Sequence, residues 1–298
     1  MIKQDYETIT VDCSADGLAI LTLNRPNVRN ALNTKMGEEL RDIFVPLRFS
    51  PEALRCIVIT GEGDKAFCAG GDLKERNGMS DEAWRKQHSI FEEAMYAVME
   101  CPIPVIAAVN GYAYGGGCEM ALMCDFIYAS SNAKFALTEV SIGIMPGAGG
   151  TQNLPRAVGE RRAKELILSA GSWSAQEGYE WGLVNRVCEP DELLMRVTDV
   201  AQRICANAPI SVRQAKKSIH YGLQVDNMTG LIYEVQCYER MIATDDRREG
   251  IRSFNEKRKP IFEGRGKPAS MSLVMSQRPW SEKYCRPCGS AHGWFRYP

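Results

Sequence analysis

The chain has 298 residues, and its 36 lysines and arginines nearly balance 37 aspartates and glutamates, for a formal net charge of −1 at pH 7. This length allows one large domain with an appendage, and an apolar content of 45% is enough for a sizeable core. The near-zero charge argues against a protein built mainly to bind nucleic acid, so an anionic ligand must meet local positive groups.

Targeting and membrane signals are missing from the sequence pattern. The first residues, MIKQDYE, do not form a basic segment followed by an apolar one, so no secretory signal is expected. The most apolar stretch, 103–109, is far too short to cross a bilayer, and no membrane association is expected. The 11 cysteines are scattered through segments typical of a core, which suits buried thiols in a reducing compartment. We expect a cytoplasmic protein, with an organelle matrix as the alternative.

The first predicted elements are a hairpin, a helix and a strand. Alternating residues over 6–10 and 18–23 predict two strands joined by a turn at Asp16-Gly17. Asn33 can cap a helix that runs to about Arg48. A continuous apolar run over 55–60 then predicts a buried strand.

Helices and strands continue to alternate after residue 80. A long helix is expected over 80–99, a buried strand over 105–109, a helix over 118–124 and a strand over 125–129. Several strands are apolar on both faces, which indicates an α/β fold.

The last part of the chain changes character. Helical periodicity covers 192–207, 212–221 and 229–244, with a break at Ala208-Pro209. We expect three sections, which are an α/β core over 1–200, a helical section over 201–266 and a disordered tail over 267–298.

Two glycine-rich turns stand out as candidate sites. Residues 66–74 read AFCAGGDLK and residues 110–119 read NGYAYGGGCE, and each follows a predicted strand. Glycine permits a close backbone approach, and a helix N-terminus offers free N–H groups, so two such turns side by side could bind one oxygen atom. Two ordinary loops are the alternative interpretation of the same pattern.

These turns, together with three later motifs, resemble the crotonase (enoyl-CoA hydratase/isomerase) family. The later motifs are AKFALTE at 133–139, GIMPGAGGTQ at 143–152 and TDDRREG at 244–250, and the resemblance covers about residues 5 to 265. It implies a spiral of ββα turns with C-terminal helices that build a homotrimer or a homohexamer. Among the family's members, the sequence is most similar to the enoyl-CoA hydratases.

The resemblance also implies the catalytic residues. Gly71 and Gly116 match the two N–H donors that bind the thioester oxygen, and Glu119 and Glu139 match the paired glutamates of hydratases. Adding water across an α,β double bond needs a base for water and an acid for the α-carbon, which two carboxyl groups in different protonation states can supply. The resemblance implies that Glu119 activates water and that Glu139 protonates the α-carbon.

The resemblance implies a substrate that carries coenzyme A, and no separate cofactor and no metal are expected. The resemblance places Ala69 at the adenine, and Lys65 and Lys74 flank the same turn and could reach phosphates. Tyr238 and Lys257 match residues that reach the coenzyme A site of a neighbouring subunit. The acyl group is expected to contact residues 76–91, 112–114 and 142–145.

Other functions remain as alternatives. Isomerisation of an enoyl-CoA, or other enolate chemistry, needs the same N–H pair. An RNA-binding member of the family would need a lysine-rich surface helix, but the helix over 33–48 mixes Lys35, Arg41 and Arg48 with acids. The remaining cysteine patterns are weak. Cys68 and Cys118 have no histidine in their motifs and are expected to be buried small residues, and Cys285, Cys288 and His292 are one ligand short of an ordinary zinc site.

Overall fold

The computed structural model describes residues 6–51 and 53–266 of the chain. The predicted disordered tail over 267–298 and the three candidate zinc ligands within it lie outside the described residues.

A six-stranded sheet forms the centre of the fold. Its strands are β1 (Ile9–Cys13), β2 (Leu18–Leu23), β3 (Cys56–Gly61), β5 (Val105–Val109), β7 (Phe126–Ser130) and β10 (Arg186–Cys188), in that spatial order. The predicted hairpin is confirmed, since β1 and β2 pair antiparallel with Ile9 opposite Leu23. All other neighbours in this sheet are parallel. Residues of β3 and β5 are buried on both faces, as the continuous apolar runs predict.

A second sheet of four short strands lies beside the first. Its order is β4 (Ala66–Cys68), β6 (Tyr112–Tyr114), β8 (Lys134–Ala136) and β9 (Ser172–Ser174). Strands β3, β5 and β7 of the first sheet are followed along the chain by β4, β6 and β8 of the second, and helices follow these. The expected spiral of ββα turns is therefore confirmed.

Helices cover the sheets and carry several of the predicted caps. Helix α1 (Thr34–Leu47) begins at Asn33, whose side chain accepts a hydrogen bond from the Met36 N–H at 3.0 Å. Helix α1 packs along α3 (Asp81–Met99), and both contribute to the large apolar core. The other elements of this part are the 3-10 helices η1 (Pro26–Val28) and η2 (Glu139–Ile142), and helices α2 (Leu73–Arg76), α4 (Gly116–Met123), α5 (Gly150–Val158), α6 (Glu160–Leu168) and α7 (Ala175–Glu180).

A buried carboxylate fixes the start of the first strand. Glu39 on α1 is 3% exposed and accepts hydrogen bonds from the Glu7 N–H, the Thr8 N–H and the Thr8 hydroxyl. Three donors satisfy this acid, and Lys35 Nζ adds an ion pair with its Oε1 atom at 3.7 Å.

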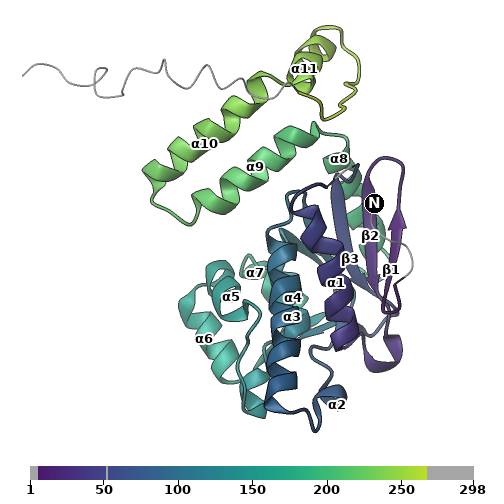
Figure 1. Ribbon diagram of the computed structural model, residues 1–298, viewed down its shortest axis with the longest axis vertical. Helices are drawn as coiled ribbons and strands as arrows, with labels where there is room; N and C mark the ends of the chain where they lie inside the picture. Colours follow the sequence, from purple (N-terminus) through teal and green to yellow (C-terminus); the bar gives the residue numbers. More distant parts are fainter. Residues whose placement is uncertain (1–5, 52, 267–298) are drawn as a thin grey trace, which may run out of the picture.

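The C-terminal helices separate into a packed helix and a projecting hairpin. Helix α8 (Leu193–Cys205) packs on the central sheet through Leu193, Val197, Ala201 and Cys205, so the predicted division between residues 200 and 201 falls inside it. Helices α9 (Pro209–Gly222) and α10 (Asn227–Ile242) form a hairpin that extends beyond the sheets, and α11 (Asp245–Asn255) follows at its end (Figure 1).

The hairpin is tied to the core by polar contacts. Lys216 Nζ on α9 donates to Asp125 Oδ2 at 2.7 Å and to the Ile103 carbonyl at 3.0 Å. Arg55 donates to the carbonyls of Cys205 and Phe262, which joins the chain segments on either side of the hairpin. No helix in the described part of the chain is long and apolar enough to span a membrane.

Candidate active site

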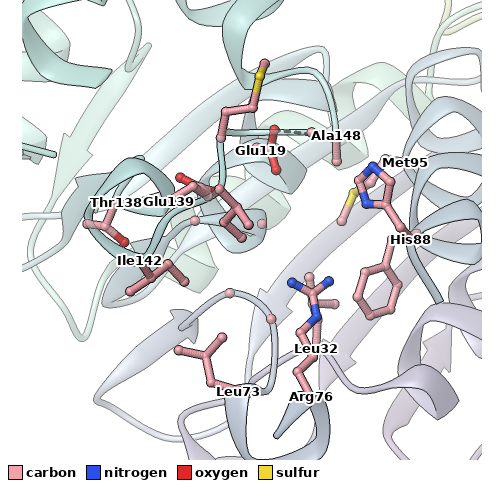
Figure 2. A pocket seen from close by; sticks show the side chains of 18 of the residues that line it. Leu32, Leu73, Arg76, His88, Met95, Glu119, Thr138, Glu139, Ile142 and Ala148 are labelled. Atoms are coloured by element: carbon pink, nitrogen blue, oxygen red, sulfur yellow. Dashed lines mark hydrogen bonds between the residues drawn. The ribbon is translucent and has the colours of Figure 1, made fainter. Parts of the chain in front are cut away.

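Both glycine-rich turns and both predicted glutamates line a single cavity of about 550 Å³ (Figure 2). The structure therefore brings Gly71, Gly116, Glu119 and Glu139 together, although they belong to separate elements of the chain. This cavity lies where strands β4 and β6 of the second sheet end.

The two turns meet because β4 and β6 are parallel neighbours. Gly70 has φ +88°, and a Cβ atom there would lie 2.8 Å from the Tyr114 carbonyl oxygen and 3.3 Å from the Gly116 nitrogen. Only glycine fits both the backbone angle and this close approach. In the described part of the chain, the N–H groups of Gly71 and Gly116 donate to no protein acceptor, so both remain available to a ligand. Gly116 is also the first residue of α4, where the N–H lacks a partner within the helix.

Glu119, on the first turn of α4, is held by backbone donors from a distant loop. Its Oε1 atom accepts hydrogen bonds from the Ala148 N–H at 2.8 Å and the Gly150 N–H at 2.9 Å. The side chain is 3% exposed, and this burial raises the pKa of Glu119, while the two N–H donors and the nearby His88 act to lower it. The donors favour the ionised carboxylate inside a site that otherwise disfavours charge.

Glu139 has a different environment. The sequence placed it on a loop, whereas it is the first residue of the 3-10 helix η2. The pKa of Glu139 is raised to about 7, mainly by burial and also by the negative charge of Glu119, while a hydrogen bond to its own backbone and the charge of Arg76 act to lower it. Its Oε2 atom is buried and has no hydrogen-bond partner among the described residues. A pKa of about 7 leaves this carboxyl group partly protonated near neutral pH, and its buried oxygen is free for a ligand.

The cavity wall is mainly apolar apart from these acids. Trp84 and Phe91 contribute from α3, and Ile142 and Met145 come from the segment after Glu139, in agreement with two of the three predicted wall segments. The third prediction was wrong, since Tyr112 and Tyr114 do not line the cavity.

Arg76 and His88 add polar groups to this wall. Both are labelled in Figure 2, where the guanidinium group of Arg76 points into the cavity and the imidazole of His88 lies near Ala148. The sequence analysis placed both residues within the expected wall segment over 76–91 but gave no role to the charge of either side chain.

The predicted coenzyme A residues have different positions. Ala69 lines the cavity, while Lys65 and Lys74 are exposed and do not line it. Tyr238 is on α10 and Lys257 follows α11, and these helices lie at the opposite end of the molecule from α2 (Figure 1). Neither residue reaches the cavity of its own chain.

The backbone donors of Ala148 and Gly150 were missed by the sequence analysis. They belong to the motif over 143–152, so the signal was present, but only the fold shows that this loop holds Glu119. Two further expectations are confirmed. Cys68 and Cys118 are fully buried, and burial raises the pKa of the Cys68 thiol to about 12 and that of Cys118 well above its usual value, so neither is an activated nucleophile.

Comparisons with known proteins find similar sequences and similar folds over most of this chain. The model of the enoyl-CoA hydratase/isomerase family matches residues 14–265. The Bacillus subtilis protein YngF is 43% identical over 87% of this chain and 99% of its own length. A crotonyl-CoA hydratase of Syntrophomonas wolfei is 41% identical over 86% of this chain and 98% of its own length. The crystal structure of an enoyl-CoA hydratase from Bacillus anthracis superimposes with a TM-score of 0.84 and 45% identity, and it covers 87% of this chain and 100% of that one.

Proposed function

The chain belongs to the enoyl-CoA hydratase/isomerase family, and from this premise we propose that it adds water reversibly across the α,β double bond of a 2-enoyl-CoA. The observation that carries the proposal is the pair of glutamates in one cavity with different partners. Burial raises the pKa of both, but two backbone N–H donors hold Glu119, whereas Glu139 has a buried oxygen without a partner among the described residues. The product is a 3-hydroxyacyl-CoA.

The unpaired N–H groups of Gly71 and Gly116 bind the thioester carbonyl oxygen in this proposal. Negative charge accumulates on that oxygen as the enolate forms, and two fixed donors stabilise it without reorganisation. The position of Gly116 at the N-terminus of α4 adds the favourable end of the helix dipole.

The two carboxyl groups then divide the proton transfers. Ionised Glu119 takes a proton from water while the water oxygen bonds to the β-carbon, and protonated Glu139 gives its proton to the α-carbon. Exchange of one proton between the acids, directly or through solvent, restores the starting state. In dehydration each role is reversed. The hydrogen bonds from Ala148 and Gly150 support the assignment of Glu119 as the base, and the pKa of about 7 supports Glu139 as the acid.

Coenzyme A enters as part of the substrate, and we propose no separate cofactor and no metal. The Ala69 backbone contacts the adenine and the exposed Lys65 and Lys74 contact phosphates. The distance of Tyr238 and Lys257 from their own cavity supports a role at the site of a neighbouring subunit.

A homotrimer or homohexamer is the proposed assembly. Helices α9 and α10 and the turn between them expose a large set of apolar side chains, which a monomer would leave in water. The set comprises Ile219, Leu223, Val225, Met228, Leu231, Ile232, Val235, Tyr238 and Ile242. The buried free thiols of the core support a reducing compartment such as the cytoplasm.

The test is hydration of crotonyl-CoA, measured as loss of the ultraviolet absorbance of the enoyl thioester. Glu119→Gln should lower kcat/KM by about 10³-fold, within the range for general acid–base catalysis, and leave binding of saturated butyryl-CoA within about threefold. Glu165→Gln, an exposed acid on α6, is the matched control and should change neither value. Unchanged turnover in Glu119→Gln would remove this residue from the mechanism. Double-bond migration without hydration in the unmodified protein would favour the isomerase alternative.

A further inference from the structure

A guanidinium group is fixed in the wall of the cavity. Arg76 ends the short helix α2, and its Nε donates to Gln87 Oε1 at 2.8 Å. Gln87 is 2% exposed, and its amide nitrogen donates to Thr34 Oγ1 at 2.8 Å and Glu75 Oε2 at 2.9 Å. Because both donors of that amide are used, its oxygen is committed to Arg76.

Aromatic rings complete the support for this side chain. The Cζ atom of Arg76 lies 4.4 Å from the centre of the Trp84 ring and 5.6 Å from that of Phe91. A guanidinium stacked on rings and held at Nε has little remaining freedom, so its orientation is set before any ligand binds. Figure 2 shows the group directed into the cavity, with Glu139 on one side and His88 on the other.

The outer nitrogens of Arg76 have no protein partner among residues 6–51 and 53–266. Nη1 and Nη2 make no hydrogen bond and no ion pair with the residues that the structure describes. The neighbouring carboxylate of Glu75 accepts from the Thr34 N–H and from Gln87. Glu139 is also near, but its pKa of about 7 leaves it largely neutral below that pH. Arg76 is therefore a partly desolvated cation with a free, bidentate donor edge.

This arrangement matches a carboxylate in geometry and charge. Two parallel N–H donors bind the two oxygens of a carboxylate better than any other small group except phosphate. A partly buried cation also carries a desolvation cost that an anion from the ligand offsets. A purely hydrocarbon acyl chain would leave the Nη donors unpaired.

We propose that the cavity selects short 2-enoyl-CoA substrates whose acyl chain ends in a carboxylate, and that Arg76 binds that carboxylate. The proposal rests on the proposed hydratase function and specifies its substrate class. The guanidinium also lies close to Gly71, since Cζ and Nη1 are each 3.2 Å from the position of a Cβ atom on that glycine. A role at the thioester oxygen is therefore the competing explanation, and the experiment must separate the two.

The experiment compares two five-carbon substrates. Glutaconyl-CoA ends in a carboxylate, and trans-2-pentenoyl-CoA has a methyl group in its place, while the reacting atoms are the same. The kcat/KM of the unmodified protein should be at least about tenfold higher with glutaconyl-CoA than with trans-2-pentenoyl-CoA. Glutaryl-CoA should also inhibit more strongly than pentanoyl-CoA, a comparison that needs no variant and no turnover.

Substitution of the arginine provides the second comparison. Arg76→Met should lower kcat/KM for glutaconyl-CoA by about 100-fold, and it should leave kcat/KM for pentenoyl-CoA within about threefold of the unmodified value. The 100-fold loss corresponds to about 2.7 kcal/mol, at about 1.36 kcal/mol per tenfold. Arg76→Lys keeps the positive charge but lacks the two parallel N–H donors, so kcat/KM should fall about tenfold for glutaconyl-CoA and stay unchanged for pentenoyl-CoA. Arg85→Met is the control, because the Arg85 side chain is 77% exposed on the same helix as Gln87. This variant should leave kcat/KM unchanged for both substrates.

Each contrary outcome has a distinct meaning. Equal losses on both substrates in Arg76→Met would place the guanidinium at the shared thioester and overturn the proposal. A preference for pentenoyl-CoA in the unmodified protein would also overturn it, with the hydratase function intact. Hydration of neither substrate, nor of crotonyl-CoA, would instead refute the hydratase function itself.

Discussion

Replacement of Glu139 by glutamine should make the protein inactive and more stable at the same time. Glutamine has nearly the same shape as protonated glutamate but cannot ionise or give up a proton to the α-carbon. Ionisation of the buried carboxyl group of Glu139 destabilises the folded state, and the neutral amide of the variant avoids this cost.

The size of this effect follows from the pKa. The pKa of Glu139 is about 7 in the folded protein, against 4.5 for an ordinary glutamate. Well below pH 4.5 the residue is protonated in both the folded and the unfolded state, so its ionisation does not affect the free energy of unfolding. As pH rises from 4.5 to 7, only the unfolded chain releases the proton, and the folded state loses stability. Above pH 7 the full penalty of about 3 kcal/mol is reached, at 1.36 kcal/mol per pKa unit.

Equilibrium urea unfolding of both proteins, at equal protein concentration and several pH values, measures this difference. Glu139→Gln should be more stable than the unmodified protein by about 1 kcal/mol at pH 5 and about 3 kcal/mol at pH 8. A difference that does not change with pH, or a variant that is less stable at pH 8, would refute the reasoning. Glu165→Gln, whose carboxyl group is exposed, should show no such pH dependence.

Three other results are expected. The kcat for hydration should fall as pH rises through about 7, because the proposed acid Glu139 must be protonated; a flat pH–rate profile would argue against this role. Glu39→Ala should lower the free energy of unfolding by about 2–4 kcal/mol in denaturant titrations, since the N–H groups of Glu7 and Thr8 lose their acceptor; a change below 0.5 kcal/mol would show that water replaces it. Leu231→Asp on the exposed face of α10 should shift the protein to monomers in analytical ultracentrifugation, whereas an unaltered sedimentation coefficient would place the subunit contact elsewhere.

The sequence predicted the elements whose local signals are strong. The cap at Asn33, the helix over 80–99 and the apolar strands β3 and β5 are all present within a few residues of their expected bounds. The short strands of the second sheet were not predicted as such. Lys134–Ala136 has only three residues, which is too few for an alternating pattern to be distinguished from a loop.

The contents of the site were harder to predict than its location. The motifs identified Glu119 and Glu139, but the loop at Ala148 holds Glu119 across 29 positions of sequence, and no local pattern encodes that contact. Tyr112 was misplaced for a simpler reason. Ala113 is fully buried in β6, so the alternation of the strand directs the neighbouring tyrosine to the other face.

The strand order of the two sheets bears on how the protein is made. In both sheets the spatial order follows the chain order, so every new strand joins the edge formed by the strand before it. A chain leaving the ribosome can therefore extend each sheet as it emerges, without waiting for a later segment to fill a gap. The last contact to Glu119 is made by Gly150, so half of the chain suffices to supply both glutamates and both N–H donors. The helical hairpin with its exposed apolar face is synthesised only afterwards. The catalytic groups can therefore be in place before a nascent subunit presents its proposed assembly surface.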